Sequence, residues 1–193
     1  MVELIPESYV APIDLEKAFA RNAPLDVDLG CGDGTFLLAM AARHPERSFL
    51  GIERMRSRVE TVCRKAVKFD NVRVLHLESA YAVRYLLPPN SIRTFYLLFP
   101  DPWPKRRHHG RRIATSEFLD AIHRALEPSG AIHVATDDRN YFGQIDQLAK
   151  NDPRFGRVDN AGNELPETRF QKRFRERRMP IYRLALRKVS PVT

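Results

Sequence analysis

Five short apolar segments alternate with amphipathic segments along the chain, and this alternation limits the possible folds more than any other feature. The apolar segments read as strands at residues 25–29, 48–52, 72–77, 94–99 and 131–136. Strands that alternate with helices are joined by crossover connections, which place them parallel in one sheet with helices on both faces. The sequence therefore predicts an α/β fold built on a doubly wound, mostly parallel sheet.

Amphipathic segments predict the helices, because apolar residues recur in them at every third or fourth position. Helices are expected at about residues 14–21, 35–43, 80–87, 115–126 and 140–150, and another between the second strand and about residue 69. In the third of these, Val59, Val62, Ala66 and Val67 are expected on the buried face. Weaker strand candidates lie at 154–158 and 181–187.

The length of the chain favours a single domain over residues 1–193. Residues 1–22 are expected to form an N-terminal arm, irregular up to residue 13, and a short helix that Asp14 caps. Residues 160–178 form a polar, basic segment that we expect to bind substrate.

The charge balance points to a polyanionic partner. The chain has 32 Lys and Arg against 24 Asp and Glu, which gives a net charge of +8. Its two cysteines, Cys31 and Cys63, form no CxxC pair, so we expect neither a zinc site nor a disulfide, and a reducing compartment. No signal peptide pattern and no apolar run of about 18 residues is present. We therefore expect a cytoplasmic protein without membrane or metal binding.

An acidic residue stands where each of the five strands gives way to a loop. These residues are Asp28, Glu53, Glu78, Asp101 and Asp137. Because the carboxyl ends of parallel strands share one edge of the sheet, we expect the five acids at one rim, where open α/β sheets bind ligands. Glu78 has an alternative, structural interpretation as a helix cap.

The loop after the first strand predicts an adenosine cofactor. Gly30, Gly32 and Gly34 allow a tight turn and a close approach of backbone to ligand. Glu53 follows about twenty residues later, where a carboxylate can accept both ribose hydroxyls. The loop departs from the dinucleotide pattern at Thr35, and the acids beside it repel a pyrophosphate but suit a cation. These features favour S-adenosylmethionine over NAD.

The fourth strand runs into three alternating prolines, at 100, 102 and 104, and then into a basic run. Proline cannot donate to a sheet ladder, so the strand must stop near Phe99. Prolines also disfavour the helical region for the preceding residue, so we expect Phe99, Asp101 and Trp103 to be extended in a stiff loop. The basic runs 105–112 and 169–178 are the expected phosphate contacts, the second docked through Phe170 and Phe174.

Over roughly residues 25–187, these motifs resemble the tRNA (guanine-N7)-methyltransferases of the bacterial single-chain type. The resemblance is carried by Asp28-Leu-Gly-Cys-Gly-Asp-Gly34, Gly51-Ile-Glu53, Phe99-Pro-Asp-Pro-Trp-Pro-Lys105, Arg111-Arg112, Ala135-Thr-Asp137 and Thr168-Arg-Phe-Gln171. It implies a Rossmann-like S-adenosylmethionine-dependent methyltransferase fold and methyl transfer to N7 of a guanine in the variable loop of tRNA.

The resemblance also implies roles for individual residues. It places S-adenosylmethionine against the glycine loop, Asp28, Glu53, Glu78 and Asp101, and makes Asp101 the residue critical for activity. The implied tRNA contacts are Lys105, Asp137, Thr168, Arg169, Phe170 and Gln171. Two positions depart from the family pattern: Asp28 and Gln171 each replace a glutamate, which shortens the first side chain and removes the charge of the second.

The chemistry of guanine N7 explains why such a site suffices. N7 carries a lone pair and no proton, so its attack needs no general base, and positioning dominates. A fixed carboxylate at Asp101 would favour the positive charge that moves onto the purine. Asp101 or Asp137 could select guanine through its N1–H and amino group. Trp103 could either stack on a base or pack as a wall.

Three other functions compete with this interpretation. One is an S-adenosylmethionine enzyme that methylates an amino group, since such enzymes carry a D-P-P-aromatic motif where this chain has Trp103 in place of the second proline. The others are a noncatalytic RNA-binding protein on a methyltransferase fold and an NAD-dependent oxidoreductase. Monomer and homodimer both remain open.

Overall fold

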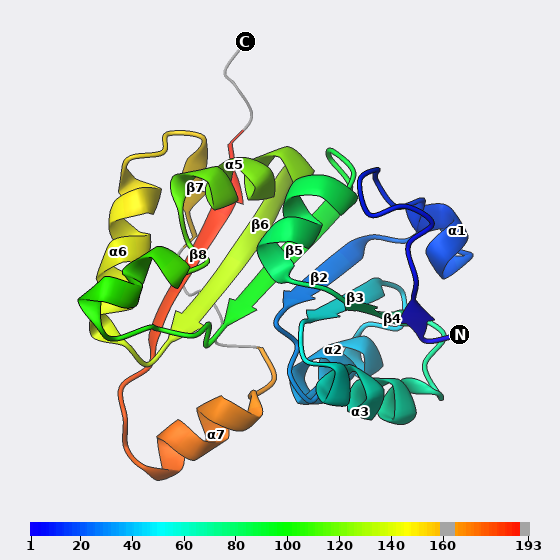
Figure 1. Cartoon of the computed structure of the whole chain (residues 1–193), viewed down its shortest axis with the longest axis horizontal. Helices are drawn as coiled ribbons and strands as arrows, with labels where there is room; N and C mark the ends of the chain where they lie inside the picture. Colours follow the sequence, from blue (N-terminus) through cyan, green and yellow to red (C-terminus); the bar gives the residue numbers. More distant parts are fainter. Residues whose placement is uncertain (159–164, 190–193) are drawn as a thin grey trace.

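A computed structural model describes residues 1–158 and 165–189. Within them, one sheet has the strand order β1-β4-β3-β2-β5-β6-β8-β7 (Figure 1). The strands are β1 (Glu3–Leu4), β2 (Leu25–Leu29), β3 (Ser48–Glu53), β4 (Val72–His76), β5 (Ile92–Leu98), β6 (Leu126–Thr136), β7 (Phe155–Arg157) and β8 (Tyr182–Lys188). Strands β1 to β6 pair in parallel, and β8 pairs antiparallel with β6 and β7. The order reverses beside β2, which confirms the predicted doubly wound sheet.

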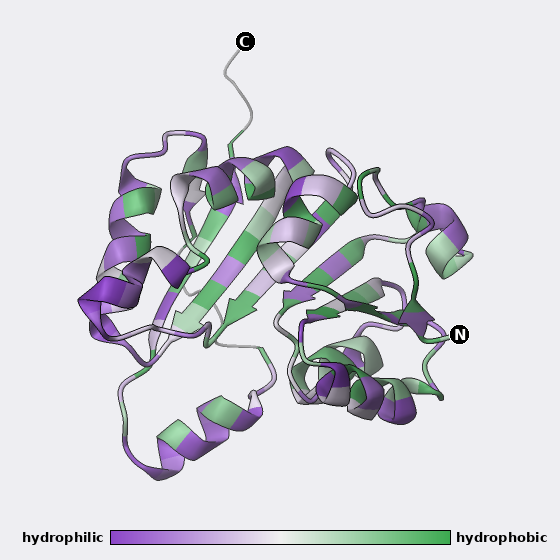
Figure 2. Ribbon diagram, viewed as in Figure 1, coloured by the Kyte–Doolittle hydropathy of each residue, from purple (hydrophilic) through white to green (hydrophobic). Residues whose placement is uncertain are grey.

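Helices cover both faces of this sheet. They are α1 (Leu15–Phe19), α2 (Thr35–Arg43), α3 (Arg56–Ala66), α4 (Ser79–Tyr81), the π-helical η1 (Ala82–Leu86), the 3-10 helix η2 (Arg106–Arg111), α5 (Ser116–Ala125), α6 (Arg139–Lys150) and α7 (Arg169–Glu176). Helices α2 and α3 contribute to one apolar cluster, and α1, η1, α5 and α6 contribute to another. Green, apolar segments concentrate on the strands in Figure 2, whereas purple segments mark the outer helix faces.

Local signals in the sequence set several helix ends. The carboxylate of Asp14 accepts a hydrogen bond from Lys17 N at 2.9 Å, as predicted for α1. Thr115 caps α5 by accepting from Phe118 N at 3.2 Å, and Asp138 caps α6 by accepting from Tyr141 N. Each such cap stabilises a helix by about 1 kcal/mol.

Some predicted boundaries are wrong. The arm is not wholly irregular, because Glu3 and Leu4 pair with β4. Helix α3 ends at Ala66, and Val67 is 77% exposed instead of buried. Strand β6 begins at Leu126, earlier than the expected start at residue 131, because an irregularity in its pairing with β5 accommodates the Pro-Ser-Gly turn.

Two helices were missed. Neither η2 nor α7 buries any residue. The apolar side chains of α7 are Phe170 and Phe174, four residues apart in an otherwise polar and charged run, which is too short a pattern to predict a helix. Helix α7 lies within the basic segment predicted at 160–178, of which residues 160–164 are outside the described part. Among residues 1–158 and 165–189, no helix is long and apolar enough to span a bilayer.

Candidate active site

A cavity of about 1000 Å³ opens at the carboxyl ends of β2, β3, β4 and β5. Asp28, Glu53, Glu78 and Asp101 line it, together with Gly30 and Gly32 of the glycine loop. Helix α7 contributes the other side through Thr168, Arg169, Phe170, Lys172 and Arg173. Four of the five predicted strand-end acids therefore share one cavity. The predicted residues Gly34, Lys105, Asp137 and Gln171 do not line it.

The glycine loop has the backbone that the sequence predicted. Gly30, Gly32 and Gly34 have φ values of 77°, 57° and 76°, which side-chain-bearing residues rarely adopt. A Cβ on Gly34 would also lie 2.8 Å from Val62 of α3. The lack of a side chain at Gly34 therefore allows the loop to pack closely on α3, while Gly30 and Gly32 face the cavity.

Glu53 ties the glycine loop to the start of α3. The residue is 3% exposed. Its Oε2 accepts a hydrogen bond from Gly32 N at 3.0 Å, and its Oε1 accepts one from Met55 N at 2.8 Å. The guanidinium of Arg58 approaches Oε2 at 3.7 Å. The carboxylate is thus fixed at the edge of the cavity before any ligand binds.

Asp28 lies beside this carboxylate and is 4% exposed. Burial, and then the negative charge of Glu53, raise the pKa of Asp28 to about 7. Two buried acids side by side attract a cationic group, because a cation relieves both the burial penalty and their mutual repulsion.

Glu78 caps α4. Its two carboxylate oxygens accept hydrogen bonds from Ala80 N at 2.9 Å and Tyr81 N at 2.8 Å. The alternative structural interpretation of Glu78 is therefore confirmed. Since Glu78 also lines the cavity, the capping role and a place in the site coexist.

The proline-rich loop departs from the expected backbone. Phe99 and Trp103 have φ values of 55° and 43°, so the prediction that both are extended is wrong. Prolines disfavour the right-handed helical region, but tertiary contacts choose among the remaining conformations. Phe99 N donates to Ala135 O at 2.7 Å while its ring packs on Phe174 at a centroid distance of 5.4 Å, which turns the chain out of the sheet. Such left-handed residues cost about 1 to 2 kcal/mol each.

Asp101 follows this turn and is largely exposed, with its side chain 67% accessible. Its Oδ2 accepts a hydrogen bond from Arg54 Nη2 at 3.0 Å. The ion pair joins the residue after Glu53 to the proline-rich loop, across the cavity. Sequence reasoning missed Arg54, because only the fold brings these two strand ends together.

Helix α7 packs on the same loop through aromatic rings. Phe170 and Phe174 lie 6.2 Å and 5.4 Å from Phe99, which confirms that these two residues dock the basic segment. Thr168 and Gln171 form a capping box at the start of the helix. Arg169 reaches Asp33 of the glycine loop at 3.7 Å, so α7 closes one side of the cavity.

The first basic run divides into two groups. Lys105 and Arg106 are exposed and free to meet an anion, whereas Arg112 is only 3% exposed. The prediction that the whole run contacts phosphates is therefore wrong for Arg112. Trp103 is half-buried, lines the cavity and lies under the guanidinium of Arg111 at 5.0 Å.

Asp137 is half-buried at the end of β6, directly before the Asp138 cap of α6. It shares the rim with the other acids but not the cavity. In residues 1–158 and 165–189, no group of three or more His, Cys, Asp or Glu is arranged to hold a metal ion.

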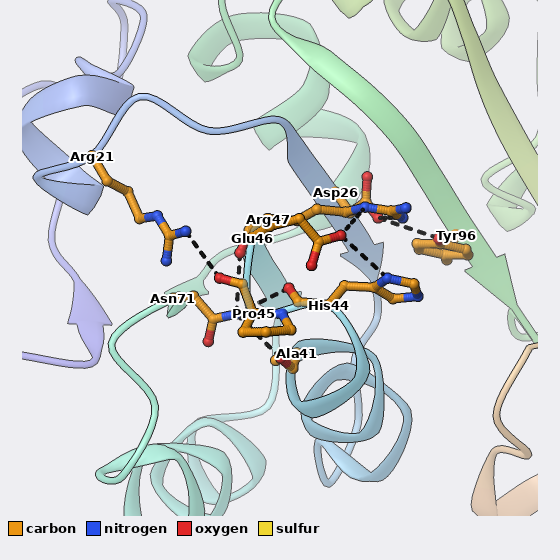
Figure 3. Close-up of polar contacts among 9 residues, drawn as sticks. All are labelled: Arg21, Asp26, Ala41, His44, Pro45, Glu46, Arg47, Asn71 and Tyr96. Atoms are coloured by element: carbon orange, nitrogen blue, oxygen red, sulfur yellow. Dashed lines mark hydrogen bonds and ion pairs between the residues drawn. The ribbon is translucent and has the colours of Figure 1, made fainter.

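A second polar cluster lies away from this cavity, near the start of β2 (Figure 3). The buried carboxylate Oδ2 of Asp26 lies 3.6 Å from Arg47 Nη1 and accepts from the Tyr96 hydroxyl at 3.4 Å. Asn71 donates to the carbonyls of Ala41 and Arg47. These contacts anchor the turn after α2 to the sheet.

Comparison with known proteins agrees with this architecture. The family described as "Putative methyltransferase" matches residues 22–184. The chain is 19% identical to the 16S rRNA methyltransferase KamB, with a TM-score of 0.66 over 92% of this chain and 93% of that one. An S-adenosylmethionine-dependent O-methyltransferase from Thermotoga maritima gives a TM-score of 0.58 at 15% identity, over 94% and 67%. These structures confirm the Rossmann-like methyltransferase fold.

Sequence relatives are more specific. The tRNA (guanine-N(7)-)-methyltransferase of Halorhodospira halophila is 40% identical over 88% of this chain and 76% of its own length. The protein of the same name from Alkalilimnicola ehrlichii is 35% identical over 92% of this chain and 78% of its own length. The chain therefore belongs to the tRNA (guanine-N7-)-methyltransferase family.

Proposed function

We propose that this protein transfers the methyl group of S-adenosylmethionine to N7 of a guanine in tRNA, the variable-loop guanine by family resemblance. The observation that carries the proposal is that the buried acids Asp28 and Glu53 share one cavity with Asp101. Family membership indicates the reaction, and the cavity contains acidic residues suited to its cofactor and its base. We place the activity in the cytoplasm.

The described residues fit the cofactor. A volume of about 1000 Å³ is at the upper end for small-molecule sites and leaves room for a base beside the cofactor. Glu53, already held by two backbone N–H groups, is suited to the ribose hydroxyls. Asp28 is suited to the cationic part, and Gly30 and Gly32 let the ligand approach the backbone. When bound, S-adenosylmethionine supplies an electrophilic methyl group on a sulfonium.

Asp101 acts on the guanine in this proposal. Its exposed carboxylate can accept from the guanine N1–H and amino group, or stand beside the ring as positive charge develops on it. In either role, the carboxylate would bind the guanine alongside its ion pair with Arg54, which is 3.0 Å long, or after that ion pair has broken. Asp137, at the neighbouring strand end, is the second candidate for base selection.

Cations around the mouth of the cavity are proposed to hold the tRNA backbone. Lys105 and Arg106 extend from the proline-rich loop, and Arg169, Lys172 and Arg173 line the cavity from α7. Phosphate contacts of this kind orient an RNA without reading its sequence. The segment 168–171, part of which lines the cavity, would therefore lie between the cofactor and the RNA. The reaction needs no metal.

Nucleoside analysis tests the proposal. The protein is incubated with methyl-labelled S-adenosylmethionine and bulk tRNA, and the tRNA is then digested. Label in 7-methylguanosine is the expected result. Label on an exocyclic amino group would favour the amino-methylating rival, and RNA binding without any label would favour the noncatalytic one.

A further inference from the structure

Arg112 is a buried cation that the proposed reaction does not use. It follows the basic run but is 3% exposed, beneath the proline-rich loop. No ion pair among residues 1–158 and 165–189 includes it. A buried arginine without a carboxylate partner needs neutral acceptors, since its desolvation would otherwise be costly.

The fork of Arg112 finds those acceptors on two different elements. Its Nε donates to the carbonyl of Pro102 at 2.8 Å. Its Nη1 donates to Asn140 Oδ1 at 3.0 Å and to Gln144 Oε1 at 2.8 Å, both on α6. The guanidinium also lies over the Tyr141 ring at 4.7 Å. One side chain therefore joins the proline-rich loop to helix α6.

Both ends of this connection are close to acids of the site. Pro102 is the residue after Asp101, and α6 begins two residues after Asp137. Two further hydrogen bonds join α6 to the segment that carries Arg112, because the Tyr141 hydroxyl accepts from Ala114 N at 3.1 Å and Gln144 Nε2 donates to Ala114 O at 3.1 Å. Arg112 thus connects a loop of strained backbone to a rigid support.

We propose that Arg112 is a positioning residue that holds the Asp101 loop in its working geometry by binding Pro102 and α6 at once. The proposal rests on the proposed methyl transfer. A lysine could not replace the arginine, because a single ammonium lacks the planar fork that bonds in two directions. Displacement of a catalytic loop by about 1 Å can reduce a rate by about 100-fold.

The chain contains its own reporter for the position of this loop. Trp103 is the only tryptophan in the sequence and follows Pro102 directly. Acrylamide quenching of its fluorescence therefore measures the order of the loop without any turnover. If wild-type protein failed to methylate tRNA, the proposed function would fail. The quenching measurement would still test whether the clamp, that is, the bonds of Arg112 to Pro102 and α6, orders the loop.

The test compares Arg112→Met with Arg124→Met. Arg124 is the matched control, because its guanidinium also donates to neutral acceptors, the carbonyls of Val83 and Arg84, but these lie in η1 and not in the proline-rich loop. For Arg112→Met we expect a single-turnover rate about 100-fold lower, stronger quenching of Trp103 and unchanged S-adenosylmethionine affinity. For Arg124→Met we expect none of these changes. A folded Arg112→Met variant with the wild-type rate or wild-type quenching overturns the proposal.

Asn140→Ala provides a test that does not depend on a buried substitution. Asn140 is exposed at the start of α6, so its removal releases one bond of the clamp without opening the core. One hydrogen bond of about 1 kcal/mol corresponds to a rate loss of about fivefold. Asn140→Asp keeps the acceptor and should restore the rate. A wild-type rate and wild-type quenching in Asn140→Ala count against the clamp.

Discussion

Gly32 N donates a hydrogen bond to Glu53 Oε2 at 3.0 Å, across 21 residues of sequence. The bond links the ends of two neighbouring parallel strands, β2 and β3, at the edge where the cavity opens. The glycine loop and the acid about twenty residues beyond it, which together predicted an adenosine cofactor, are thus bonded directly to each other.

Replacement of Glu53 is expected to affect cofactor binding. Glu53→Ala removes a fixed, charged acceptor, and a charged hydrogen bond contributes about 1.5 to 3 kcal/mol, so the S-adenosylmethionine Kd should rise about 10- to 100-fold. Isothermal titration calorimetry measures it. Glu60→Ala is the control, because Glu60 is half-exposed on α3 and, within residues 1–158 and 165–189, forms an ion pair only with the exposed Arg56. An unchanged Kd in Glu53→Ala would remove Glu53 from the site.

Asp101→Asn should show the opposite pattern. The amide preserves the shape of the side chain but cannot stabilise positive charge on the purine, so kcat should fall by about 100- to 1000-fold. Cofactor affinity should stay within twofold of wild type, because Asp28 and Glu53 are untouched. Stopped-time transfer assays and calorimetry on the same preparation separate the two effects. A large loss of cofactor affinity with little change in kcat would mean that Asp101 has been assigned to the wrong step.

The raised pKa of Asp28 predicts an unusual pH dependence of stability. In the unfolded chain this carboxyl ionises near pH 4, whereas in the folded protein its pKa is about 7. Between these values the folded state binds the extra proton, so the contribution of Asp28 to the free energy of unfolding falls as pH rises, by about 4 kcal/mol in total. Urea unfolding of the cofactor-free protein from pH 4 to pH 8 measures this slope. Asp28→Asn should flatten it, and an equally steep slope in that variant would contradict the assignment.

The same group predicts the pH dependence of cofactor binding. A cationic ligand favours ionised Asp28, so S-adenosylmethionine affinity should weaken by up to about tenfold for each pH unit below 7. Calorimetric titrations from pH 5.5 to pH 8 test this. Affinity that does not change over that range would show that Asp28 does not meet the cationic part of the cofactor.

Salt dependence should identify the phosphate contacts. Replacing both Lys105 and Arg106 with alanine removes two cations, so the slope of log K for tRNA against log salt should decrease by about 1.4 to 1.8. Filter binding at several salt concentrations measures the slope. Lys68→Ala is the control, since Lys68 is exposed just beyond the end of α3, away from the cavity. A slope as steep as in the wild type would place the RNA elsewhere.

Much of the site could be predicted because short-range rules govern it. The glycine conformations and the caps formed by Asp14 and Glu78 follow from patterns within a few residues, and the alternation of strands and helices then brings four strand-end acids to one cavity. What escaped prediction depends on long-range contacts: the turn at Phe99 is set by Ala135 and α7, the Asp101 partner Arg54 comes from another strand, and Arg112 is buried by α6. The sequence of a basic run does not distinguish arginines exposed to solvent from an arginine buried against a helix.

Guanine N7 is the proposed acceptor of the methyl group in this cavity. This assignment is tested most directly by single-turnover transfer to two tRNA transcripts, one normal and one made with 7-deazaguanosine, in which carbon replaces N7. We predict transfer to the normal transcript and none to the 7-deaza transcript, although both bind with similar affinity. Methylation of the 7-deaza transcript at a comparable rate would show that the methyl group goes to an atom other than N7.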